Sequence, residues 1–170
     1  MSEEKTNAST TANVANESSH SDDYHDYLNS NGVIEADPAL MLGDENAPEK
    51  ITKHDLLKAW IRGWWANEVP HSFDRMIAPA FLFGLMPVLQ KLYKNKVMLG
   101  EAYQRHMVFF NTQAIWGQGL ITGITASLEE ERAKALHEGR VAEAITPAAI
   151  NATKIGLMGP LAGIGDSIDS

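Results

Sequence analysis

The sequence contains no cysteine, so disulfide bonds, thiolate nucleophiles and cysteine-ligated metals are excluded. Basic residues are also too few for a nucleic-acid surface: the formal net charge is -8 at pH 7, and no stripe of Lys and Arg is present. No apolar segment typical of a secretory signal peptide follows the first methionine. We therefore expect neither a nucleic-acid partner nor a secreted, disulfide-linked protein.

The negative charge is concentrated in residues 1–50, which carry a net charge of -9, whereas residues 51–170 carry +1. The first segment is rich in Ser, Thr, Asn, Asp and Glu, and it has too few apolar side chains to offset the entropy lost on folding. We therefore predict a disordered acidic tail over 1–50 and a folded domain over 51–170. Two tail histidines, His20 and His25, lie beside acidic residues, but no framework holds them, so we expect no metal and no other cofactor.

The folded part is predicted to begin with an amphipathic helix over 52–66. A Thr-x-x-Asp pattern typical of a helix N-terminus is followed by apolar residues at helical spacing. The apolar positions include Trp60, Trp64 and Trp65, and three cations lie off this stripe. Tryptophan rings beside cations are typical of a helix at a membrane surface. A helix packed on a soluble core is the alternative interpretation.

Two uncharged segments follow this helix. Ser72 is predicted to cap a second helix from residue 73, which leads into an apolar run over 76–89 that is too short to cross about 30 Å of hydrocarbon. The segment 107–128 is long enough, but its amide and hydroxyl side chains favour the interior of a helical bundle over contact with lipid on all sides.

The glycine-rich segment 156–166 ends on Asp166 and resembles a phosphate loop only superficially. No strand precedes it and it lacks a Lys-Ser/Thr pair, so we interpret it as discontinuous backbone of the kind found in transporter cores. No convincing β alternation occurs anywhere. The predicted fold class is therefore an all-α, membrane-associated helical bundle with apolar segments broken by Gly and Pro.

Six short motifs occur in order along residues 51–167: KHDL at 53–56, SFDRM at 72–76, PVLQKLY at 87–93, RHMVFFNT at 105–112, LEEERA at 128–133 and KIGLMGPLAGIGD at 154–166. In this order they resemble the IID component of the mannose/fructose/sorbose family of sugar phosphotransferase transporters. The last motif is long and highly specific, and FFNT is nearly so. Ile77, the Gln113-Ala114 pair and the segment 64–71 depart from the family pattern. They suggest a subgroup that handles amino-sugar acids or sugar–amino-acid adducts rather than mannose.

The resemblance implies a subunit of the bacterial inner membrane that works beside a IIC subunit in a hetero-oligomer, in contact with membrane lipid. Together they take up a sugar, which cytoplasmic IIA and IIB phosphocarrier proteins phosphorylate. The IID subunit carries no phosphoryl group itself, so we expect no enzyme activity. Because family members continue beyond the last motif, the resemblance also suggests a truncated chain. A peripheral helical interaction protein that transports nothing, or an inactive remnant, is the alternative.

A sugar site needs convergent amide and hydroxyl groups, and polar groups of this kind are costly within a membrane. The candidate sugar ligands are Asn111, Thr112, Gln113 and Gln118, with hydrogen bonding between helices as the alternative role. The residues expected to have structural roles are Asp74 and Arg75, as a pair that pins the second helix, with His106, Gly159, Gly163, Gly165 and Asp166. The acidic run 129–131 is predicted to be a solvated helix face, with a docking surface for IIB as the alternative.

Overall fold

The computed structural model describes residues 33–42, 47–67, 69 and 73–168, apart from the side chains of residues 166 and 168. Helices account for nearly all of the regular structure in these ranges, which confirms the all-α prediction. They are η2 (Pro38–Met41), α1 (Lys53–Ala66), α2 (Ala78–Leu92), α3 (Lys96–His106), α4 (Trp116–His137), η3 (Val141–Glu143) and α5 (Pro147–Ile168). Within the described residues, no helix combines the length and the apolarity needed to cross a membrane.

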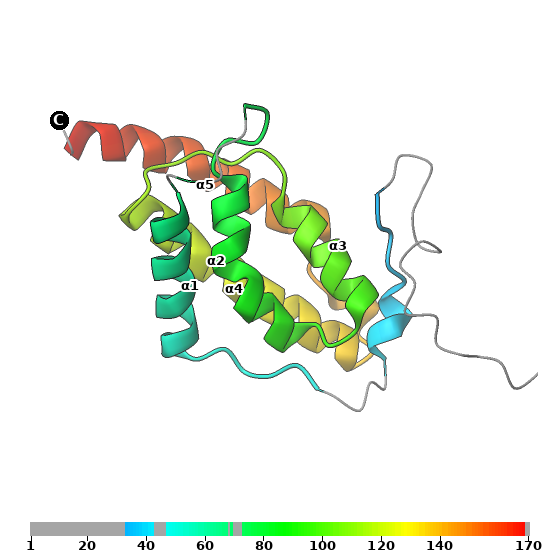
Figure 1. The fold of residues 1–170 in the computed structure, drawn as a ribbon. Coiled ribbons are helices and arrows are strands. Elements are labelled where there is room, and N and C mark those ends of the chain that lie inside the picture. Colours follow the sequence, from blue (N-terminus) through cyan, green and yellow to red (C-terminus); the bar gives the residue numbers. More distant parts are fainter. Residues whose placement is uncertain (1–32, 43–46, 68, 70–72, 169–170) are drawn as a thin grey trace, which may run out of the picture.

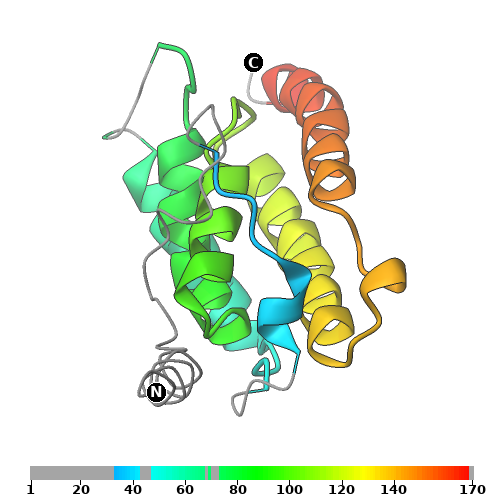
Figure 2. The ribbon, with the colours of Figure 1, turned by 90° about the vertical axis from the view of Figure 1, so that its right-hand side faces the viewer.

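The helix α2 lies at the centre of the bundle, where it contacts α1, α3 and α4 (Figure 1). The last helix, α5, runs along the outside of α4 and also touches α3 (Figure 2). The core therefore forms around α2, with α1 on one side and α4 on another.

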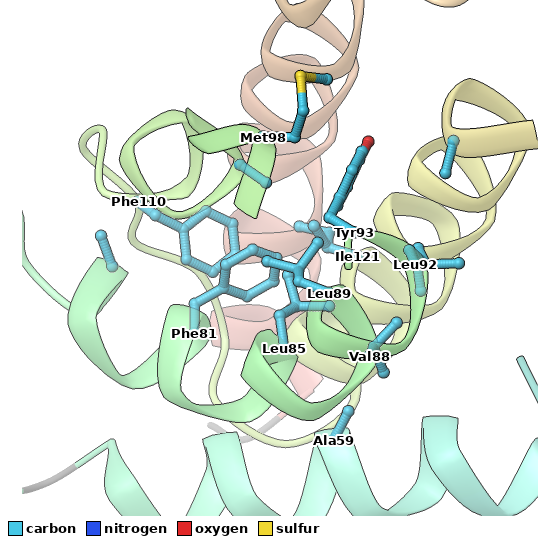
Figure 3. Close-up of a cluster of buried hydrophobic side chains, with 14 of the residues drawn as sticks. Ala59, Phe81, Leu85, Val88, Leu89, Leu92, Tyr93, Met98, Phe110 and Ile121 are labelled. Atoms are coloured by element: carbon cyan, nitrogen blue, oxygen red, sulfur yellow. The ribbon is translucent and has the colours of Figure 1, made fainter. Parts of the chain in front are cut away.

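The core contains a run of apolar side chains from α2, together with Phe110 and Ile121 (Figure 3). The Phe81 and Phe110 rings pack with centroids 4.4 Å apart. Met41 is 2% exposed and belongs to the same cluster. Part of the segment that we predicted to be a tail therefore packs on the domain, because η2 has an apolar side chain to bury; residues 1–32 lie outside the described residues.

The helix α1 begins where the sequence predicted. Thr52 and Asp55 form a capping box in which each side chain accepts a hydrogen bond from the other residue's backbone N–H. This arrangement pairs backbone donors that have no partner within the helix. The prediction of a helix over 52–66 is therefore confirmed.

The predicted start of the second helix is wrong. Residues 73–75 form turns and α2 begins only at Ala78, while Ser72 lies outside the described residues. Met76 has a positive φ of 53°, a value that interrupts a right-handed helix. The Ile77 N–H donates to the Phe110 carbonyl at 3.0 Å, and this bond ties the segment to the loop before α4.

The two later segments also differ from our expectation. The uncharged segment 107–128 is divided into a loop and the first part of α4, which begins at Trp116. The glycine-rich segment is not discontinuous, because α5 continues through it with Pro160 inside the helix. Pro160 has no N–H to donate to the Gly156 carbonyl, four residues earlier. Gly156 is exposed, so this unpaired carbonyl is not buried.

The close approach of α1 and α2 generates a prediction. A Cβ at Gly84 would lie 2.5 Å from the Ala59 carbonyl oxygen and 3.0 Å from the Gly63 backbone. We expect Gly84→Ala to lower the free energy of unfolding by about 2 kcal/mol, because neither backbone can move away cheaply.

The matched control is Gly123→Ala on α4, where nothing lies within 4 Å of an added Cβ. It should stabilise the protein by about 0.5–1 kcal/mol through the higher helix propensity of alanine. Chemical denaturation followed by circular dichroism measures both changes. Equal effects of the two substitutions would contradict the close contact.

Candidate functional site

The loop between α3 and α4 lies along one face of α5. The α5 residues that contact it are Lys154, Met158 and Gly165, and Leu161 between them contacts Gly117 in the first turn of α4. Their i, i+4, i+7, i+11 spacing defines a single face of a helix. The contacts follow the loop in sequence order, from Phe110 over Lys154 to Gln113 beside Gly165. A straight helix face therefore sets the path of the segment that contains the FFNT motif.

Two predicted sugar ligands are held by Met158. The Asn111 backbone N–H donates to Met158 Sδ at 3.0 Å, and Thr112 Oγ1 donates to the Met158 carbonyl at 3.4 Å. Thr112 is buried, whereas Asn111 is exposed. The structure thus fixes the backbone of Asn111 and leaves its amide side chain at the surface.

Gln113 forms the cap of α4. Its Oε1 accepts from the backbone N–H groups of Ile115, Trp116 and Gly117 at 3.0, 2.9 and 3.2 Å. A Cβ at Gly165 would lie 2.5 Å from Gln113 Cγ, so only glycine lets α5 approach this cap. The side chain that departs from the family pattern therefore has a local structural role at the start of α4.

Gln118 lies inside a helix contact. It is 1% exposed, and its Oε1 accepts a hydrogen bond from Nδ2 of the buried Asn67 at the end of α1. A Cβ at Gly63 would lie 2.7 Å from Gln118 Nε2, so the glycine makes room for this amide. The structure therefore separates Gln118 from the exposed part of the loop.

A fully buried carboxylate, Glu129, lies beneath this loop and joins three elements. Its Oε1 accepts from Arg105 Nε at 2.9 Å and lies 2.8 Å from His106 Nε2. Its Oε2 accepts from Tyr93 Oη at 2.6 Å and from Arg105 Nη2 at 3.1 Å. The prediction that the acidic run forms a solvated face is wrong at Glu129, because these partners replace water around its charge.

The electrostatic balance of this cluster is set by burial and by neighbouring charges. Burial by itself raises the pKa of Glu129, but the Arg105 charge and the hydrogen bonds from His106 and Arg105 hold it well below its usual range. Burial lowers the pKa of His106, against the opposing effect of Glu129. The pair is therefore an ionised carboxylate beside a neutral imidazole at pH 7.

Lys154 of α5 is a second buried charged group near the cluster and is 1% exposed. Its Nζ lies 5.5 and 5.8 Å from the ring centroids of Phe81 and Phe110, and it has no hydrogen-bond partner among the described residues. Burial lowers the pKa of Lys154 to about 8, with Glu129 opposing the shift and Arg105 adding to it. The positive charge of the Lys154 amine is therefore stabilised by two aromatic faces and one carboxylate.

The remaining predicted residues are scattered. His106 is fully buried. Asp74 and Arg75 pair at 3.3 Å on the surface before α2, and Arg75 Nη1 donates to the Met107 carbonyl at 3.5 Å, so the pair faces solvent. Gly159 and Gly163 have nothing within 4 Å of an added Cβ. The Asp166 side chain lies outside the described residues.

The tryptophans of α1 are divided between two environments. Trp60 Nε1 donates to the Ile115 carbonyl at 2.6 Å, and its ring packs against Gly119 of α4. Trp64 and Trp65 are 49% and 73% exposed. Trp60 therefore belongs to a helix contact, and only the other two remain available to a surface.

Sequence reasoning missed Glu129, although a signal for it existed. Buried residues on α4 recur at helical spacing, and Glu129 continues that stripe between Ala126 and Ala133. If the helical periodicity is continued through the charged run 129–131, it predicts that one glutamate lies on the buried face of the helix. The neighbouring Glu131 is exposed, as the solvated-face prediction requires.

The profile of the PTS system mannose/fructose/sorbose family IID component matches residues 50–170. The chain is 39% identical over 119 residues to the sorbose-specific EIID component of Lacticaseibacillus casei, which covers 70% of this chain and 39% of that protein. It is 37% identical over 126 residues to the mannose-specific EIID component of Escherichia coli K12, which covers 71% and 40%. The chain thus spans about 40% of the length of these relatives.

A solved structure is similar as well. In the cryo-EM structure of the mannose transporter ManYZ in complex with microcin E492, one chain is 38% identical, with a TM-score of 0.60. The similarity covers 71% of this chain and 41% of that chain. Sequence and fold therefore point to the same relatives.

The buried carboxylate generates a stability prediction. Glu129→Gln should lower the free energy of unfolding by about 3 kcal/mol, because the buried Arg105 loses its fully buried carboxylate partner and keeps only Glu101 on its Nη1. The control Glu131→Gln, two residues along the same helix, should change it by less than about 0.5 kcal/mol. Urea denaturation of both variants tests the difference, and a small effect of Glu129→Gln would show that the charge is not compensating Arg105.

The amine on α5 generates a pH prediction. Because the pKa of Lys154 is about 8 in the folded protein against 10.5 for an ordinary lysine, the unfolded chain binds more protons between these values. The cost of the buried charge is fully present below pH 8 and disappears above pH 10.5, so stability should rise with pH across this window. The rise amounts to about 3 kcal/mol at most.

Lys154→Met removes the titrating group while keeping an apolar chain of similar length. The difference in unfolding free energy between this variant and the parent protein should shrink as the pH increases through the window. Denaturant midpoints at a series of pH values measure it. A difference that does not change with pH would contradict a buried, titrating Lys154.

Proposed function

The chain belongs to the IID family of mannose/fructose/sorbose phosphotransferase systems, and on that premise we propose that it acts as a membrane subunit of a sugar transporter. It works with a IIC subunit in the bacterial inner membrane to form the path for sugar uptake. Cytoplasmic IIA and IIB proteins supply the phosphoryl group. The observation that carries this proposal is the family match over residues 50–170.

Two relatives support the choice of sugar as substrate class. One is named for sorbose and the other for mannose, and they match 70% and 71% of this chain. The related solved structure is that of a mannose transporter. We propose uptake of a sugar of this class, with no assignment of the individual sugar.

We also propose that this subunit performs no phosphoryl transfer of its own. His106 is the histidine next to the FFNT motif, and it is 0% exposed with its Nε2 directed at Glu129. A phosphocarrier protein needs an accessible nitrogen, and this imidazole offers none to an incoming partner. Its geometry favours a structural role over a phosphohistidine.

Of the four candidate sugar ligands, Asn111 fits the role best. Its side chain is exposed on a loop whose backbone is held by Met158, so an amide is presented from a fixed position. Thr112 and Gln113 remain part of the proposal as residues that shape and support the loop, and Gln118 as a residue that joins α4 to the end of α1. An amide that both donates and accepts hydrogen bonds matches the hydroxyl groups of a sugar.

The test is sugar uptake by cells that express this chain with a matching IIC subunit and phosphocarrier proteins. Asn111→Ala should reduce uptake by about fivefold to tenfold at equal protein level, because one hydrogen bond to the sugar is lost. The control is Ser127→Ala, which removes an exposed polar group on α4. Unchanged uptake by Asn111→Ala contradicts the site, and absence of uptake by the unmodified chain contradicts the transport role.

A further inference from the structure

The outward surface of α1 carries two parallel rows of side chains with different chemistry. The first row is basic and contains His54, Lys58 and Arg62 at i, i+4, i+8 spacing. The second row is apolar, and its members are all exposed by about half or more: Leu57 at 49%, Ile61 at 47%, Trp64 at 49% and Trp65 at 73%. The same side of the helix thus offers positive charge and apolar area side by side.

A groove of about 270 Å³ lies between the rows. It is lined by His54, Leu57, Lys58, Ile61 and Arg62, so both rows contribute to its walls. Arg62 is fixed there, because its guanidinium carbon lies 4.5 Å above the ring centroid of Phe83 on α2. A stacked guanidinium is a preorganised donor group for a phosphate oxygen.

Apart from Arg62, which stacks on Phe83, the two rows lie outside the buried side of α1. The buried residues of α1 are Ala59, Gly63 and Ala66, on the side that meets α2. Trp60 points into the contact with α4. The four apolar side chains of the second row therefore remain outside, although burying them inside would be favourable.

In the part of the chain that the structure describes, no carboxylate neutralises the positive charge of the groove. Asp55 is the only acidic residue of α1, and it accepts from Lys91 at 2.7 Å. Among the described residues, neither Lys58 nor Arg62 has a carboxylate within ion-pair distance. A ligand that combines an anion with an apolar body would satisfy both rows.

We propose that this groove binds the headgroup of an anionic phospholipid, so that α1 lies along an anionic membrane surface. Lys58 and Arg62 donate to the phosphate oxygens, and Leu57 and Ile61 contact the glycerol and the upper acyl chains. Trp64 and Trp65 enter the interface at headgroup depth. The inference rests on the membrane location in the proposed function and is independent of any residue that binds sugar.

The exposed face of α5 provides an internal comparison. Ile155 and Ile164 are both 50% exposed there, as much as Ile61 on α1. The lysine beside them, Lys154, is buried, so this face presents no cation with its apolar area. Apolar exposure therefore occurs on α5 as well as on α1, but on α5 no exposed cation of the helix accompanies it.

The experiment is co-sedimentation of the full 170-residue chain with vesicles of phosphatidylcholine alone or mixed with phosphatidylglycerol. We expect binding to the anionic vesicles, weakened by high salt, and much weaker binding to the neutral ones. Lys58→Gln should weaken binding to the anionic vesicles about fivefold, because one cation is lost at the surface. Trp65→Ser should weaken it through the loss of apolar contact.

Each variant has a matched control. Lys134→Gln removes one exposed cation of α4 and should leave binding unchanged, and Ile155→Ser removes an equally exposed apolar side chain of α5 with the same expected result. All four positions are substantially exposed, and circular dichroism verifies that each variant is folded. Equal losses for test and control variants would overturn the inference.

Three further results would also overturn it: absence of binding to either vesicle, equal binding to both vesicles, or binding of soluble glycerol phosphate as tight as that of the vesicles. The inference and the transport role fail separately. Loss of vesicle binding with sugar uptake retained contradicts the lipid site alone. Vesicle binding without sugar uptake contradicts the transport proposal alone.

Discussion

A single buried carboxylate organises this domain. Glu129 extends from α4 into the interior, where it is 0% exposed, and it receives hydrogen bonds from the end of α2 and the last turn of α3. Ionised groups are tolerated in such surroundings only when partners replace their hydration. Because Tyr93 and Arg105 supply that replacement from separate helices, the carboxylate fixes how three helices meet.

The cluster is connected to the surface loop through α5. Lys154 rests on Phe110 and on Phe81, while Met158, one turn later, holds the backbone of Asn111 and the hydroxyl of Thr112. The charge balance in the core and the position of the FFNT loop therefore depend on the same helix face. This connection explains how a loop on the surface is kept in a defined conformation.

In α1, small residues form the contact with α2, so the large side chains of the helix are not needed for that contact. Gly63 and Ala59 allow the backbone of α2 to approach so closely that Gly84 has no space for a side chain. Packing by small residues satisfies the contact without Trp64 or Trp65. The large aromatic rings therefore remain on the outside, beside the basic groove.

The sequence by itself determined the local features: the helical periodicity, the Thr52–Asp55 cap and the ordered motifs that identify the family. These depend on residues within a few positions of one another, so their physics is contained in short segments. Only the tertiary structure decided that Glu129 is buried, that Trp60 turns inward and that α5 continues through its glycines. Glu129 meets Tyr93 and Arg105 across 36 and 24 residues of sequence, and burial of a charge is decided by such distant partners.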